Sequence, residues 1–164
     1  MIKPFGLFQE DRVFFKLPQP SAFHSAIISE DKLWVIPGSS SISGDSDISG
    51  GLWSLDLNER SLGWDLHPPC PGGQRVQPYF VNAKLGDGSE SLFVFGGRQS
   101  GEGILQDSWR YVPDEREWRS LADLPRRLAG GGVFSAGPSH ILLLPNLGGY
   151  FYYLILTFKF KSSC

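Results

Sequence analysis

Short apolar runs separated by polar turns recur along this 164-residue chain. The runs are rich in Val, Ile, Leu and aromatic residues, which is typical of β-strands, and the Gly, Pro, Ser and Asp clusters between them are typical of turns. We expect strands at residues 22–28, 33–36, 52–57, around 64, 78–84, 91–95, 109–112, 118–121, 131–134 and 141–144. The pattern therefore predicts an all-β protein.

The expected strands form a repeat. Trp64 and Trp118 are 54 residues apart, and so are Pro71 and Pro125. A period near 50 residues with four short strands per unit is typical of propeller blades. Because the tryptophans recur at equivalent positions, they favour packing between sheets over stacking on a sugar ring.

The period divides the chain into segments. We expect an N-terminal segment with the last strand of a preceding blade (1–21), a first unit (22–75), a second unit (76–127), the first half of a third unit (128–146) and an atypical apolar tail (147–164). Propellers close with four to eight blades, so about three four-stranded blades make an incomplete ring. The chain is then a fragment, or copies of it complete the ring, or its terminal blades are covered in another way.

The tail departs from the repeat. A polar loop and a third strand with an Asp are expected after Asn146, and the apolar run from Tyr150 to Phe158 holds neither. We therefore expect the repeat to stop at Asn146. The run of nine residues is shorter than the roughly 20 that span a bilayer, so no membrane span is expected. A truncated or altered end explains the tail, as does a segment that docks on a partner or a membrane surface.

Several of these positions resemble the kelch repeat. The glycine pair Gly96 and Gly97 ends one expected strand, Tyr111 lies in the next strand of the unit, and Trp118 follows the turn after it. The resemblance implies an incomplete kelch β-propeller.

Longer phrases resemble one kelch subgroup, which contains N-acetylneuraminate epimerase and the cyclically permuted mutarotase-like proteins. These phrases are residues 95–98, 118–125 and 139–144. Enzymes of that subgroup interconvert sugar anomers by acid–base chemistry at one end of a six-bladed propeller. The resemblance implies a sugar mutarotase or epimerase in a completed form, with this chain alone inactive. The alternative is a non-catalytic kelch module that binds another protein.

The loops between second and third strands are expected at the same end of the sheets as the segments that lead into each first strand. The two loops are residues 39–51 and 98–106. A sugar or a protein partner is expected to bind through them, and open blade faces offer a route to self-association.

Four charged residues converge on this end in the expected fold. In a mutarotase, Glu102 with Arg98 would serve the catalytic acid–base step, and Arg75 with Arg127 would bind the substrate. The alternative is that Arg75 and Arg127 pair with carboxylates between blades.

The composition narrows the choice of partners and compartment. With 15 basic and 17 acidic residues, the chain has no basic field for nucleic acid. No secretory signal is visible in residues 1–10, so a cytoplasmic location is expected. Cys70 and Cys164 are read as incidental thiols rather than a disulfide framework.

Metal and cofactor sites are not expected. Residues 45–50 with Asp56 have the spacing of a calcium loop, but expected strands flank them where an EF-hand has helices. His24, His67 and His140 are too widely spaced for a structural zinc site.

Overall fold

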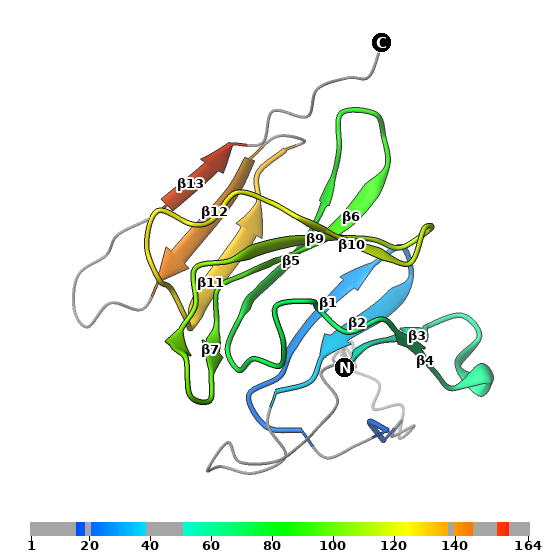
Figure 1. Ribbon diagram of the computed structural model, residues 1–164. Coiled ribbons are helices and arrows are strands. Elements are labelled where there is room, and N and C mark those ends of the chain that lie inside the picture. The colour runs from blue at the N-terminus through cyan, green and yellow to red at the C-terminus, as the bar shows by residue number, and fades with distance from the viewer. Residues whose placement is uncertain (1–15, 19–20, 39–50, 138–139, 146–153, 158–164) are drawn as a thin grey trace, which may run out of the picture.

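The computed structural model describes residues 16–18, 21–38, 51–137, 140–145 and 154–157, and its sheets stack side by side (Figure 1). The first blade has the order β1-β2-β3-β4 and comprises β1 (Ser25–Ser29), β2 (Lys32–Ile36), β3 (Leu52–Asp56) and β4 (Trp64–His67). A single turn of 3-10 helix, η1 (Arg60–Leu62), precedes β4.

The second blade repeats this order. It comprises β5 (Tyr79–Lys84), β6 (Glu90–Phe95), β9 (Ser108–Val112) and β10 (Glu117–Ser120). A third sheet has the order β11-β12-β13 and comprises β11 (Gly131–Ser135), β12 (His140–Pro145) and β13 (Leu154–Thr157). All of these strand pairs are antiparallel, which confirms the all-β prediction and its four-stranded units.

Two apolar layers lie between the sheets because alternate side chains of a strand point to opposite faces. The layer between the first and second blades is made by Trp34, Ile36, Leu52, Phe80, Leu92, Val94 and Tyr111. The layer between the second blade and the third sheet is made by Tyr79, Val81, Ala83, Leu85, Phe93, Phe95, Leu124, Leu128, Ile141 and Leu143. The second blade is thus covered on both faces, as a blade inside a propeller is.

Two segments differ from the sequence-based expectation. Leu154–Thr157 pairs with β12 as a third strand, so the expectation of no further strand after Asn146 is wrong. The strand contains no Asp, but pairing with β12 requires only main-chain hydrogen bonds. The expected loop 98–106 contains a two-stranded hairpin of β7 (Arg98–Gln99) and β8 (Gly103–Ile104).

Candidate ligand groove and its framework

A groove of about 490 Å³ opens at one end of the second blade. Three segments line it: residues 71–73 before β5, the β7–β8 hairpin with the residues that follow it, and the link from β10 to β11. Its charged and amide side chains are Gln99, Glu102, Gln106, Asp107, Asp123 and Arg127. The expected convergence of loops and connecting segments at one end is therefore observed for this blade.

An ion pair between a buried arginine and a partly exposed aspartate forms the framework of the groove. Arg75 is 2% exposed, and its two terminal nitrogens each donate to one carboxylate oxygen of Asp107 at 2.8 Å. The guanidinium also donates to the carbonyls of Gly96 and Gly73, and the Trp109 indole donates to Asp107 at 2.6 Å. Arg75 thus ties the segment before β5 to the start of β9.

The charge of Asp107 is stabilised by these donors. Burial acts to raise the pKa of Asp107, but hydrogen bonds from Arg75 and Trp109 outweigh it and hold that pKa below its usual value. Gly72 makes this packing possible, because a Cβ at position 72 would overlap the Arg75 guanidinium and the Asp107 carboxylate.

The exposed part of the groove is made by other groups. Glu102 lies in the turn between β7 and β8, and Arg127 donates to the carbonyl of Ile104 at 2.8 Å, which fastens this hairpin to the link before β11. The Gln106 amide donates to Asp123 at 3.3 Å. Carboxylate, amide and guanidinium groups at a solvent-open surface offer both acceptors and donors to a hydroxyl-rich ligand.

The structure brings two of the four expected site residues into one groove. Glu102 and Arg127 both line it. Arg75 lies beneath it with its guanidinium committed to Asp107, in place of the substrate contact expected for it. Arg98 is exposed on β7 and is not among the lining residues; its main chain pairs with Val76 and Ile104.

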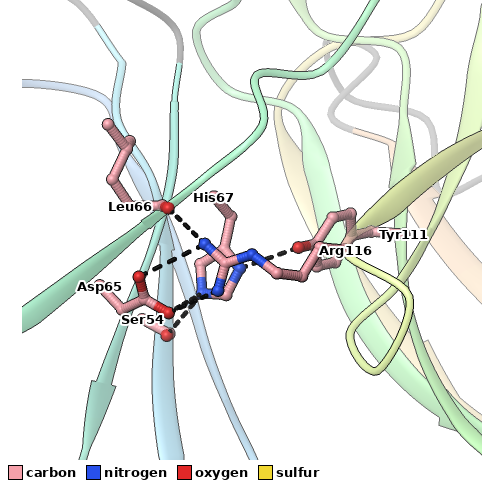
Figure 2. A network of polar contacts seen from close by, with 6 residues as sticks. All are labelled: Ser54, Asp65, Leu66, His67, Tyr111 and Arg116. Carbon is pink, nitrogen blue, oxygen red and sulfur yellow. Dashed lines mark hydrogen bonds and ion pairs between the residues drawn. The ribbon is translucent and has the colours of Figure 1, made fainter.

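A second polar constellation lies between the first two blades (Figure 2). His67 of β4 is 5% exposed; its Nε2 lies 2.8 Å from Ser54 Oγ and its Nδ1 lies 2.8 Å from the Tyr111 hydroxyl on β9. Arg116, in the turn between β9 and β10, binds Asp65 at 2.7 Å and donates to the Leu66 carbonyl at 2.6 Å. First-blade and second-blade side chains therefore meet in one network.

This network does not have the geometry of a Ser-His-Asp nucleophile. In such a triad the Ser and the Asp use different ring nitrogens. Here Ser54 and Asp65 both contact Nε2, at 2.8 and 3.3 Å, and Tyr111 occupies Nδ1. The sequence predicts no role for His67; its spacing of two from Asp65 in an expected strand indicates only that both side chains share a face.

Metal ligation is not evident in the part of the chain that the structure describes. Its described residues contain no group of three or more His, Cys, Asp or Glu side chains arranged to hold an ion. Residues 45–50 of the calcium-like spacing lie outside the described residues. Asp56 instead accepts hydrogen bonds from the main-chain N–H groups of Asn58 and Glu59 and so caps the turn after β3. Among described residues, no helix has the length and apolarity to cross a membrane.

The stacked four-stranded antiparallel sheets give this chain the fold of a partial kelch-like β-propeller, in agreement with the following similarities. It is 25% identical over 118 residues to beta-scruin of Limulus polyphemus, an alignment that covers 70% of this chain and 12% of beta-scruin. The solved structure of YjhT superposes with a TM-score of 0.62 at 23% identity, covering 77% of this chain and 34% of that chain. The chain therefore spans about a third of the YjhT chain and less of beta-scruin. No model of a known protein family matches the sequence.

Proposed function

We propose that the groove binds a sugar, and that in a completed propeller Glu102 transfers the proton at the anomeric oxygen, as a mutarotase or epimerase requires. The observation that carries the proposal is the meeting of Glu102 and Arg127, from different segments, beside Gln99 and Asp123. Carboxylate and amide groups bind adjacent hydroxyls, and a guanidinium binds a carboxylate or hydroxyl. The resemblance of residues 95–98, 118–125 and 139–144 to the mutarotase-like subgroup supports the same ligand class.

For this chain alone we expect binding without measurable catalysis. The groove is open to solvent, whereas an acid–base site needs donors held around the substrate with water excluded. The expected affinity is therefore weak, in the millimolar range that about 4 kcal/mol of binding free energy gives.

Sugar binding can be tested by following backbone amide NMR shifts while N-acetylneuraminate or glucose is added to the protein. We expect shifts confined to the segments that line the groove, weakened by Glu102→Gln and by Arg127→Gln. Arg98→Gln is the matched control, because Arg98 is a neighbouring exposed charge outside the groove. The groove would be rejected as a sugar site if no shifts appear at about 50 mM sugar, a concentration 50-fold above a dissociation constant of about 1 mM. Equal weakening by all three variants would reject it as well.

A second candidate is non-catalytic protein binding, which one specific surface favours. The outer face of the third sheet exposes Phe134 (56%), Ile155 (55%) and Leu144 (38%). Register places Phe134 and Ile155 on the same side, since both are cross-strand partners of Leu142. The opposite side of the same sheet buries Ile141 and Leu143 against the second blade. This surface suits another blade, including one from a second copy of the chain.

Self-association through this surface can be tested by light scattering. Phe134→Asp with Ile155→Asp should shift the mass toward the monomer. Leu62→Asp is the control, because Leu62 is 75% exposed on η1 and away from the third sheet. A protein that is already monomeric at about 0.1 mM, or one that loses its association equally in the control, would count against this candidate.

A further inference from the structure

We propose that His67 and its partners form an acid-sensitive latch, which holds the first and second blades together while the ring is neutral and releases the β9–β10 turn when the ring binds a proton. The latch joins β4 to β9 through Tyr111, and β4 to the following turn through Arg116 (Figure 2). It belongs to the interface between blades and is independent of the groove.

In the neutral form, the ring and the two hydroxyls beside it match as donors and acceptors. A neutral imidazole has one N–H donor and one acceptor, and the hydroxyls of Ser54 and Tyr111 can each supply the complementary role. A protonated ring has two donors and no acceptor. Both hydroxyls would then have to accept from the ring, so the one that had donated to it, on buried Ser54 or on buried Tyr111, would need a new acceptor for its own proton.

The charges around the ring oppose a proton on it. Asp65 on β4 is the one carboxylate that contacts the ring in the described residues, and it already pairs with Arg116. Lys32 on β2 is the second nearby cation, while Ser54 on β3 and Tyr111 on β9 are uncharged. A charged His67 would therefore place three cations around the Asp65 carboxylate: the ring itself, Arg116 and Lys32. The ion pair between Arg116 and Asp65 would then break.

The direction of the acid response follows. Burial, reinforced by Arg116 and Lys32 against the attraction of Asp65, holds the pKa of His67 at about 4, below its usual 6.5. The unfolded or released chain binds a proton near pH 6.5, so the latched form is fully favoured above that pH and is lost as the pH falls toward 4. A shift of this size corresponds to about a 100-fold change in the latching equilibrium between pH 7 and pH 4.

Amide hydrogen exchange at pH 7 and at pH 4.5, corrected for intrinsic rates, tests the latch. We expect protection in β4, β9 and β10 to fall at pH 4.5 while β5 with β11 stays protected. His67→Gln cannot titrate and should remove most of this pH dependence, whereas His140→Gln, a change at an exposed His of the third sheet, should keep it. Uniform loss of protection over all sheets, or an unchanged pH dependence in His67→Gln, would overturn the proposal.

A second measurement does not depend on how well His67→Gln folds. The His67 ring signals of the unmodified protein should titrate near pH 4, and Arg116→Gln should move that titration upward because it removes a cation and frees Asp65. A His67 titration near pH 6.5 in the unmodified protein, or no upward move in Arg116→Gln, would also overturn it.

Discussion

The indole nitrogen of Trp118 in the second blade donates a hydrogen bond to the carbonyl of Pro68, just after the last strand of the first blade, at 2.8 Å. Trp64 occupies the equivalent position in the first blade and makes the same kind of bond to the carbonyl of Lys16 at 3.0 Å. Each repeated tryptophan thus fastens its blade to the segment before it. This explains the repeat of the residue by packing between units, as expected.

Replacing Trp118 with Phe should lower the free energy of unfolding by about 1 kcal/mol through the lost hydrogen bond, in addition to the effect of the smaller ring. Trp53→Phe is the matched control. The Trp53 indole nitrogen is buried and has no hydrogen-bond acceptor in the part of the chain that the structure describes, so its removal breaks no bond. Urea unfolding of both variants gives the comparison. Equal losses would show that ring volume, and not the bond to Pro68, sets the stability.

The strands were predictable because their signals are local. Alternating apolar residues and Gly- or Asp-rich turns predict the strands of both blades, most of them to within one residue, although β1 begins three residues later than expected. The β7–β8 hairpin was missed because its polar residues resemble a loop; Gly101 and Gly103, both at φ +81°, allow the chain to turn tightly there. The strand β13 was missed because an Asp was required of it, whereas pairing with β12 needs only free main-chain groups and apolar side chains.

Removing the Arg75 guanidinium should destabilise the protein strongly. Arg75→Met leaves the partly exposed Asp107 carboxylate without the two Arg75 donors, and an unpaired charge of this kind costs on the order of 2 kcal/mol. Arg127→Met is the control, since Arg127 is exposed and gives one hydrogen bond to a carbonyl. Thermal unfolding should show the larger loss for Arg75→Met. A similar loss in both would mean that the ion pair contributes little.

The same pair predicts a dependence on acid. The pKa of Asp107 is lowered in the folded protein, so its ion pair stabilises the fold above the usual carboxylate pKa near 3.8, and this contribution is lost as the pH falls through the lower folded value. In Arg75→Met this part of the acid dependence should shrink. Unfolding at pH 7 and at pH 3 measures it, and an undiminished acid dependence in the variant would assign the effect to other carboxylates.

Gly72 should tolerate no side chain. A Cβ there would meet the Arg75 guanidinium, the Asp107 carboxylate and the Trp109 indole together, so Gly72→Ala should force the pair apart and lower the free energy of unfolding by about 2 kcal/mol. Gly86→Ala is the control, because nothing lies within 4 Å of its Cβ position. Denaturant unfolding compares the two. An equally small effect of both would show that the segment 71–73 can move away from the ion pair.

The candidate site was only partly predictable, for reasons of distance along the chain. Which loops meet at one end follows from strand order, so the placement of Glu102 and Arg127 beside one groove was predictable, while their roles there stay predictions. The partner of Arg75 is 32 residues away, and nothing local distinguishes an Arg that binds a ligand from one that pairs with Asp107. The contact of His67 with Tyr111 spans 44 residues and two blades, and it depends on how the sheets stack.

Cys70 offers a reporter for the segment that frames the groove. Its side chain is buried next to Gly72 and Arg75, and burial raises the pKa of the thiol to about 11, partly offset by Arg75. Because the thiolate is the form that is alkylated, iodoacetamide at pH 8 should label Cys70 at least about 30-fold more slowly in the folded protein than in urea. A Cys164→Ser background isolates the signal. Because Arg75→Met removes the ion pair that holds this segment, it should speed the labelling of Cys70 under native conditions. Rapid labelling of Cys70 in the unmodified folded protein would instead show that residues 70–75 open readily. The segment could not then form a rigid wall of the groove.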